Sequence, residues 1–168
     1  RRGLRSGDLQ PHEADVISNV LALEIKTASN VMTPRTVLFA LHSDVTLAEA
    51  AADEHLLRHS RVPIYENNPD DVIGIVHRRD ILDAAAKDQF KTSLEQLMRP
   101  VHFVVETVKL DQLLRTFLEQ RQHLVVVTDE FGSVSGIVTL EDVLEEILGR
   151  EIVDEFDQVV DLRAFARQ

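Results

Sequence analysis

Gly136 closes a short apolar segment, and a residue without a Cβ lets a ligand approach the backbone there. Thr139 is then expected at the N-terminus of the last helix, where free N–H groups and the helix dipole favour a phosphate. Asp142 follows one helical turn later and is placed to accept hydrogen bonds from ribose hydroxyls. The alternative is structural, with Thr139 as the helix N-cap and Asp142 as its first-turn acid. The residues alone leave both interpretations open.

Other patterns that would support catalysis or metal binding are missing from the sequence. The chain has no cysteine, which excludes a disulfide, a thiolate zinc site, an iron–sulfur cluster and a cysteine nucleophile. It has no P-loop, dinucleotide fingerprint or HExxH motif, and Val134 stands where a nucleophile elbow needs serine. His55 and His59 have the spacing of a two-histidine metal pair, but without a third ligand an exposed pair of helix histidines is favoured. The sequence indicates a binding module and not an enzyme.

The charge balance excludes several classes of partner. In 168 residues, 18 Lys and Arg stand against 29 Asp and Glu, a net charge of −11. Such a chain lacks the basic surface of a nucleic-acid binder, and anionic lipid would repel it. No apolar run approaches the about 20 residues of a membrane span, so we expect no membrane insertion by this segment. The basic start, residues 1–7, lacks the apolar stretch of a signal peptide and is interpreted as the cut edge of a longer protein.

Two segments of the chain repeat one another. The matches follow the same order with nearly constant spacing, as in a duplicated unit with short insertions. They pair Met32/Pro34 with Met98/Pro100, Val45/Leu47 with Val108/Leu110, 61–65 with 123–127, and 74–82 with 136–144.

Each repeat predicts the element order β-α-β-β-α. The expected elements are an extended piece at 36–41, a helix at 46–57 and strands at 62–65 and 72–76, then an extended piece at 101–105, a helix at 110–118 and strands at 124–128 and 134–138. A closing helix follows each last strand. Extra helices are expected within 11–30 and after the capping-box pattern at 92–95. With about three short strands each, neither half buries both sheet faces alone, so we expect an α/β (α+β) fold whose two repeats are related by a pseudo-twofold axis.

Four separated blocks resemble a known family. They are VMTPR at 31–35, SRVPIY at 60–65, GIVTLEDVLEEILG at 136–149 and EIVDEFD at 151–157. Together they are similar to the tandem CBS-domain pair, or Bateman module, of the CorC/HlyC and CNNM-like group, which contains magnesium and cobalt transport proteins and haemolysin-like membrane proteins. The resemblance covers about residues 10–157.

The resemblance implies a domain organisation. Residues 1–30 would be a helix and linker after a membrane domain, and the CBS repeats would span 31–91 and 92–150. The acidic tail, 151–168, would lead to a further C-terminal domain. We therefore interpret the chain as a soluble module of a larger membrane protein, at the cytoplasmic face of the cell membrane.

The resemblance also implies a ligand, an adenine nucleotide such as ATP or AMP, in a cleft between the two halves. With it, nucleotide binding becomes the favoured role of Gly136, Thr139 and Asp142. The residues that would complete the cleft are Thr33, Arg61, Val62, Pro63, Ile64 and Tyr65. Thr33 would bond the base or a phosphate, and Arg61 would pair with a phosphate unless it is simply solvated. Pro63 and Ile64 would offer apolar walls for adenine, although Ile64, like Val62, has the alternative role of β-core.

The first repeat departs from the motif, because His77 stands where Thr139 stands in the second. A histidine is bulkier than threonine and mostly neutral at pH 7. We therefore expect one nucleotide site and an empty or altered second cleft.

These features predict a regulatory module that binds adenine nucleotide and controls a divalent-cation transporter. Mg²⁺ would accompany ATP and offset the repulsion between its phosphates and the acidic chain. The partners would be a transmembrane domain of the same polypeptide and a second copy of the module, joined through CBS helices whose apolar faces include Leu113, Phe117, Leu144 and Ile147. Two alternatives stay open: a dimerisation scaffold without a ligand, and a direct Mg²⁺ sensor built from acidic residues.

Overall fold

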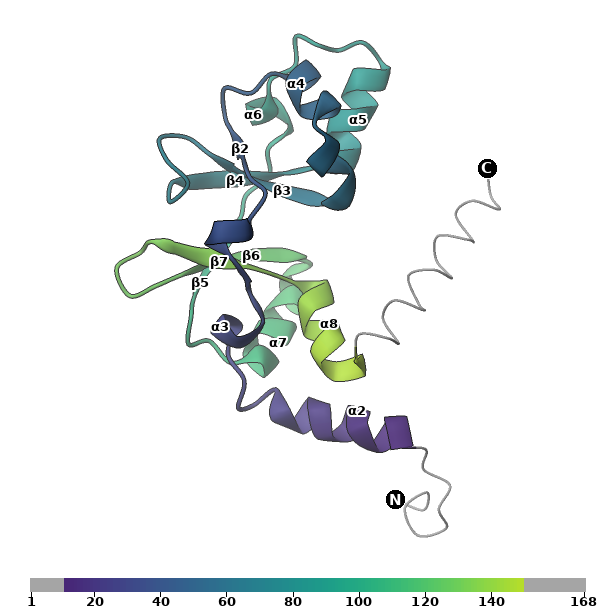
Figure 1. The fold of residues 1–168 in the computed structure, drawn as a ribbon, viewed down its shortest axis with the longest axis vertical. Helices are drawn as coiled ribbons and strands as arrows, with labels where there is room; N and C mark the ends of the chain where they lie inside the picture. Colours follow the sequence, from purple (N-terminus) through teal and green to yellow (C-terminus); the bar gives the residue numbers. More distant parts are fainter. Residues whose placement is uncertain (1–10, 150–168) are drawn as a thin grey trace. The chain divides into compact units, whose positions relative to one another are not determined.

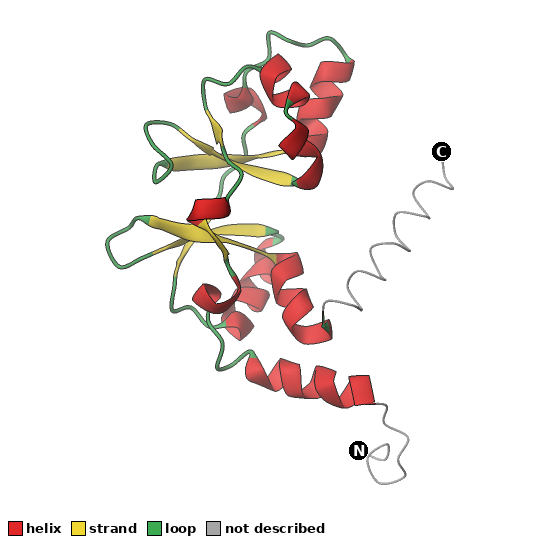
Figure 2. Ribbon diagram, viewed as in Figure 1, coloured by secondary structure: helices red, strands yellow, loops and turns green. Residues whose placement is uncertain are grey.

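The computed structural model describes residues 11–149, and its elements follow the expected β-α-β-β-α order twice (Figures 1 and 2). The first repeat comprises β2 (Leu41–His42), α4 (Leu47–Ala52), β3 (Arg61–Tyr65), β4 (Val72–His77) and α5 (Arg78–Ala86). The second comprises β5 (His102–Val105), α7 (Leu110–Gln120), β6 (Leu124–Thr128), β7 (Val134–Thr139) and α8 (Leu140–Leu148). The α/β class and the two repeats are thereby confirmed.

Shorter elements lie before, within and between these repeats. They are α2 (Pro11–Ala22), α3 (Ala28–Val31), β1 (Thr33–Pro34), the 3-10 turns η1 (Arg35–Val37) and η2 (Glu54–Arg58), and α6 (Leu94–Leu97). The linker helix α6 was expected, but its N-cap is Ser93, whose Oγ accepts a hydrogen bond from the Gln96 N–H at 3.3 Å. The acidic tail at 151–168 lies outside the described residues.

Three expected elements are interrupted by local hydrogen bonds. The helix expected at 46–57 ends at Ala52, because Asp53 Oδ1 accepts from the His55 N–H at 2.9 Å and begins η2 instead. The extended piece expected at 36–41 contains η1, closed by the Leu38 N–H, so that only its end enters β2. The segment 11–30 forms two helices, since a new capping box starts α3 at Thr27.

The chain divides into two compact units, and the first, the sheet unit, contains residues 33–106 and 124–137. It holds a three-stranded sheet in the order β2-β3-β4 and a four-stranded sheet in the order β1-β7-β6-β5. β3 and β4 are antiparallel, whereas β5 and β6 are parallel. β1 pairs with β7 in antiparallel register, Thr33 opposite Ile137 and Pro34 opposite Gly136. A short strand at the start of the first repeat therefore completes the sheet of the second.

Two apolar clusters form the core of the sheet unit. One gathers the buried faces of the first repeat: Leu41, Leu47, Ala50, Leu56, Val62, Ile64, Val76, Ile81, Ala84 and Leu94. The other joins strands of both sheets through Val72, Ile75, Leu124, Val126, Val134 and Ile137, and we call it the inter-sheet cluster. β4 thus has apolar residues on both faces, as strands covered on two sides do.

The helical unit comprises the described residues 11–32, 107–123 and 138–149. α2 lies against α8, where the Asn19 Nδ2 donates to the Ile147 carbonyl at 3.2 Å. After α2 ends, Lys26 Nζ pairs with Glu146 Oε2 of α8 at 2.5 Å. Leu113 and Phe117 on α7 are almost fully buried, so they are unsuited to meet a second copy, whereas Leu144 and Ile147 are half-buried. None of the described helices has the length and apolar character to cross a bilayer.

We predict that Gly74→Ala destabilises the sheet unit by about 1–3 kcal/mol, the range for overpacking. A Cβ at position 74 would lie 2.4 Å from Met98 Cγ and 2.9 Å from the Arg99 carbonyl oxygen. The methionine can move, but the Arg99 backbone cannot move freely, since it exchanges two hydrogen bonds with Ile75 at 3.0 and 2.8 Å. Urea unfolding is the measurement. Adding Met98→Ala should restore only part of the loss, and full restoration would contradict the backbone clash.

Candidate functional site

Thr139 and Asp142 form a reciprocal capping box at the start of α8. The Asp142 N–H donates to Thr139 Oγ1 at 3.2 Å, and the Thr139 N–H donates to Asp142 Oδ2 at 2.8 Å. The structural role considered for this pair is therefore present. A capping box of this kind satisfies two backbone donors that a helix start would otherwise leave to solvent or to a ligand.

The capping box leaves part of each side chain available. The Thr139 hydroxyl accepts one hydrogen bond there, and its own O–H, which also interacts with the Asp142 carboxylate, can rotate to donate to a ligand instead. Asp142 uses Oδ2 for the Thr139 N–H, which leaves Oδ1 as an acceptor. A rotatable donor and an acceptor thus lie at the helix start, which suits a phosphate oxygen and a sugar hydroxyl respectively.

Burial raises the pKa of the Asp142 carboxyl, and the nearby Glu141 charge acts in the same direction. The hydrogen bonds from the Thr139 backbone and side chain oppose this shift without cancelling it. The carboxylate is therefore held where its charge is poorly solvated. A ligand that donates hydrogen bonds to the carboxylate would favour its charged form.

Thr33 and Gly136 are brought close by the pairing of β1 with β7, since Thr33 faces Ile137 and Pro34 faces Gly136. Thr33 is half-buried, and its hydroxyl makes no hydrogen bond to any residue within 11–149. These two predicted residues therefore lie in adjacent strands of the sheet unit.

The predicted segment Arg61–Tyr65 is the strand β3. Val62 and Ile64 are fully buried members of the first apolar cluster, so their alternative role as β-core is the one observed. Pro63 is buried as well, while Arg61 and Tyr65 at the strand ends are half-buried. Of this segment, only the two end side chains have substantial surface with which to meet a ligand.

His77 occupies the N-cap of α5 but makes no capping hydrogen bond with its side chain. Burial, followed by the charges of Arg99 and Arg61, lowers the pKa of its imidazole, which favours the neutral form. Asp80, which corresponds to Asp142 in the repeat, pairs with Arg99 at 3.0 Å between Oδ2 and Nη2. The first repeat thus carries an ion pair where the second carries a capping box.

The paired histidines His55 and His59 stack against Phe39, with ring centroids 5.7 and 5.1 Å from the Phe39 ring. His55 Nδ1 also lies 3.0 Å from Asp53 Oδ1. Within residues 11–149, no group of three or more His, Asp or Glu side chains could hold a metal ion. The pair has a packing role that the sequence pattern did not indicate.

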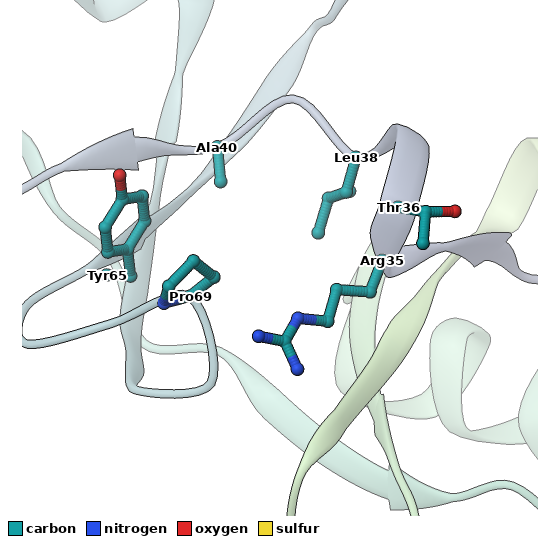
Figure 3. A pocket seen from close by; sticks show the side chains of 6 residues that line it. All are labelled: Arg35, Thr36, Leu38, Ala40, Tyr65 and Pro69. Carbon is teal, nitrogen blue, oxygen red and sulfur yellow. The ribbon is translucent and has the colours of Figure 1, made fainter.

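A cavity of about 410 Å³ opens in the sheet unit (Figure 3). Its lining residues are Arg35, Thr36, Leu38, Ala40, Tyr65 and Pro69. Tyr65 is the one member of the predicted nucleotide set among them. Sequence reasoning missed the other five, because they come from η1, from the chain after it and from the β3–β4 turn, and no motif joins these segments.

Comparison with known proteins gives the family. The CBS domain family matches residues 28–87 and 94–149. The "Magnesium and cobalt efflux protein CorC" of Pasteurella multocida is 34% identical over 91% of this chain and 51% of its own length. The chain spans about half or less of the length of the curated relatives it matches.

Solved structures of isolated domains match over nearly their whole length. The CBS domain of a bacterial CNNM/CorC family Mg²⁺ transporter is 35% identical, with a TM-score of 0.82, over 88% of this chain and 90% of that one. The CBS domain of a CNNM/CorC family Mg²⁺ transporter in complex with ATP is also 35% identical, with a TM-score of 0.77, over 83% of this chain and 99% of that one. The motif-based resemblance is confirmed, and the chain belongs to the CBS-domain family, within its CNNM/CorC group.

Proposed function

We propose that the chain is a regulatory module that binds an adenine nucleotide, ATP or AMP, and thereby controls divalent-cation transport. The observation that carries this proposal is the polar start of α8, in a chain 35% identical to a CBS domain solved with ATP. The Thr139 hydroxyl would donate to a phosphate, and Asp142 Oδ1 would accept from a ribose hydroxyl. In the capping box Asp142 Oδ1 keeps its acceptor capacity, and the Thr139 O–H would turn from the Asp142 carboxylate to the phosphate.

The remaining predicted contacts differ in what they can contribute. Thr33 offers an unused hydroxyl, and Gly136 offers backbone that a ligand can approach. Arg61 would contribute charge, whereas Val62, Pro63 and Ile64 would contribute only backbone, because their side chains are buried. Mg²⁺ would enter with the phosphates of ATP, since a chain of net charge −11 repels the bare polyphosphate.

Regulation requires that the nucleotide bind two conformations with different affinity, so that its concentration shifts their populations. The protein controlled would be a magnesium or cobalt transporter, as the name of the Pasteurella relative suggests. We propose that a transmembrane domain of the same polypeptide is the direct partner, with this module at the cytoplasmic face of the membrane. As a binding module it would leave ATP unhydrolysed.

A ligand-free dimerisation scaffold is the second candidate, favoured by the hydrogen bonds that Thr139 and Asp142 already make with each other. Calorimetry with ATP, AMP and ADP, each with and without Mg²⁺, separates the two functions. Binding heat with ATP or AMP supports the nucleotide module. No heat with any of the three supports the scaffold.

We predict that Thr139→Ile abolishes most nucleotide binding while the fold survives. The change removes the hydroxyl and places a branched apolar group where the phosphate is expected. Loss of the cap alone should cost about 0.5–2 kcal/mol of stability.

Thr46→Ile is the matched control, since Thr46 Oγ1 caps α4 by accepting from the Glu49 N–H at 3.1 Å. It should lose similar stability with unchanged nucleotide affinity. Full ATP affinity in folded Thr139→Ile would falsify the assignment.

We predict that Asp142→Asn stabilises the ligand-free protein at neutral pH. Because burial raises the pKa of Asp142, the folded state binds the carboxyl proton more tightly than the unfolded state does. Stability therefore falls as pH rises from the unfolded-state pKa through the higher folded-state pKa. Asparagine keeps an oxygen for the Thr139 N–H without the buried charge. The gain in unfolding free energy should shrink below the ordinary aspartate pKa of about 3.9. Urea unfolding of both proteins at several pH values measures it; a gain that grows toward acid pH would contradict the burial argument.

We predict that the module forms a homodimer whose affinity rises with salt or Mg²⁺. Each copy carries a net charge of −11, and this repulsion is screened beyond ~8 Å at physiological ionic strength. Leu118 on α7 is 64% exposed, and Leu118→Glu should weaken association if helices form the interface. Light scattering across ionic strengths is the measurement. A strict monomer at high micromolar concentration, with salt and Mg-ATP present, would rule the dimer out.

A further inference from the structure

The cavity in the sheet unit has apolar walls and a charged mouth. Leu38, Ala40, Pro69 and the ring of Tyr65 supply the walls, and Arg35 reaches in from η1 (Figure 3). We infer that this cavity binds a small monocarboxylate with an apolar body the size of one or two rings, and that Arg35 pairs with its carboxylate. The volume of about 410 Å³ lies in the lower part of the range for small-molecule pockets.

The walls are held in place before any ligand arrives. The Tyr65 ring meets the His42 ring edge-on, with centroids 5.3 Å apart and planes at 90°. The turn that carries Pro69 is closed by hydrogen bonds from Asn67 Nδ2 to Asp71 Oδ2 at 2.6 Å and from the Asp71 N–H to the Asn68 carbonyl at 2.8 Å. Leu38 packs against the inter-sheet cluster on its other side. A preformed cavity reduces the ordering cost of binding.

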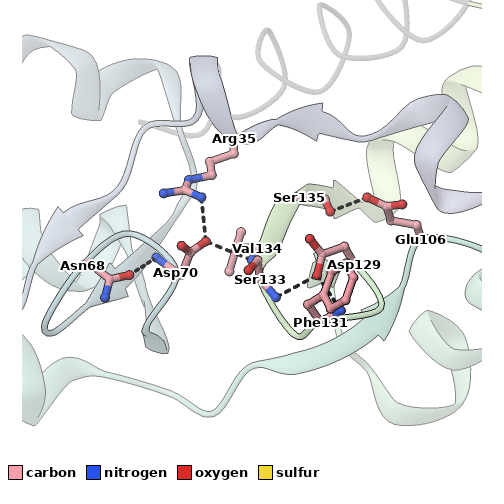
Figure 4. Close-up of polar contacts among 9 residues, drawn as sticks. All are labelled: Arg35, Asn68, Asp70, Glu106, Asp129, Phe131, Ser133, Val134 and Ser135. Carbon is pink, nitrogen blue, oxygen red and sulfur yellow. Dashed lines mark hydrogen bonds and ion pairs between the residues drawn. The ribbon is translucent and has the colours of Figure 1, made fainter.

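Arg35 is oriented by a carboxylate that is itself fixed. Arg35 Nη1 lies 2.7 Å from Asp70 Oδ1, and the same oxygen accepts from the Val134 N–H at 3.1 Å (Figure 4). The Asp70 N–H donates in turn to Asn68 Oδ1 at 2.8 Å. A guanidinium carries several N–H donors, and Asp70 engages one nitrogen in the described contacts, so others remain for a ligand.

One further polar group at the cavity has no hydrogen-bond partner. The Tyr65 hydroxyl bonds to no other residue in the described part of the chain, whereas the Thr36 hydroxyl points away from the cavity (Figure 3). The Tyr65 hydroxyl adds donor and acceptor capacity beside apolar walls, a combination that orients ligands in small-molecule sites.

The charges select a monocarboxylate over a phosphate. The planar guanidinium matches a carboxylate in a bidentate arrangement. Asp70 already partly neutralises Arg35, and the chain is strongly acidic, so a dianion would meet net repulsion. Only Tyr65 is shared with the predicted nucleotide contacts, so this inference stands whether or not the chain binds ATP.

The test is a titration of the ¹⁵N-labelled 168-residue chain with 2-naphthoate, 2-naphthamide and 2-naphthyl phosphate, followed by amide chemical shifts. We expect naphthoate to bind at least tenfold more tightly than the neutral amide and than the phosphate, with shifts centred on residues 35–40 and 65–70. Equal affinity of acid and amide, tighter binding of the phosphate, or shifts elsewhere would overturn the proposal. So would a spectrum of folded protein that does not change at any ligand concentration.

Three variants separate the charge contact from the fold. Arg35→Gln should weaken naphthoate binding at least tenfold and leave the amide unchanged, whereas simple unfolding would remove both. Ala40→Leu fills the cavity without touching the guanidinium and should abolish the binding of both ligands. Asp70→Asn keeps an oxygen for the Val134 N–H, removes the competing charge and should tighten naphthoate binding severalfold.

Unchanged naphthoate affinity in folded Arg35→Gln would refute the role of Arg35. Thr139→Ile should leave naphthoate binding intact, which distinguishes this site from the proposed nucleotide contacts.

Discussion

The inter-sheet cluster is the contact on which the sheet unit depends. Three strands of one repeat form a sheet with two apolar faces, and the helices of that repeat cover only one of them. Val72 and Ile75 on β4 therefore need partners from β6 and β7, which Leu124, Val126 and Val134 supply. β1 adds backbone pairing to this apolar contact, since a strand at the start of the first repeat pairs within the second sheet. A single repeat would expose these faces, which explains why the sequence is duplicated.

Duplication of the backbone has not preserved the chemistry at the two equivalent helix starts. α8 begins with the Thr139–Asp142 capping box, whereas α5 begins with His77, without a side-chain cap, and with Asp80 paired to Arg99. The two aspartates occupy corresponding places but have different partners. The Asp142 carboxylate accepts from the Thr139 N–H, and the Asp80 carboxylate pairs with the Arg99 guanidinium. The fold fixes the position of each carboxylate. The residues that contact the carboxylate determine whether it can still accept a hydrogen bond from a ligand.

Sequence reasoning succeeded where the signal was local or repeated. The repeat, the strands with their apolar runs, and the cap of α8 all depend on neighbouring residues, and the structure contains each of them. It failed where a side chain overrides periodicity, as Asp53 does when it ends α4 and begins η2. It also failed where distant segments meet. The Arg35–Asp70 contact joins residues that carry no shared pattern, so the cavity that Arg35 lines was not foreseen.

In so acidic a chain, the partner of each aspartate determines what the carboxylate can still bind. Asp70 and Asp80 each face an arginine, and much of their charge is already compensated. Asp142 has no cationic partner in the described part of the chain; the Thr139 N–H and hydroxyl hold its carboxylate, and burial keeps its pKa raised. A carboxylate whose charge is buried and only partly compensated is the one that new hydrogen-bond donors stabilise most. Sugar hydroxyls are such donors, and they bring no extra negative charge of their own. The same reasoning gives Arg35 the opposite role, because beside a carboxylate that already shares the cation, a singly charged anion meets less repulsion than a dianion.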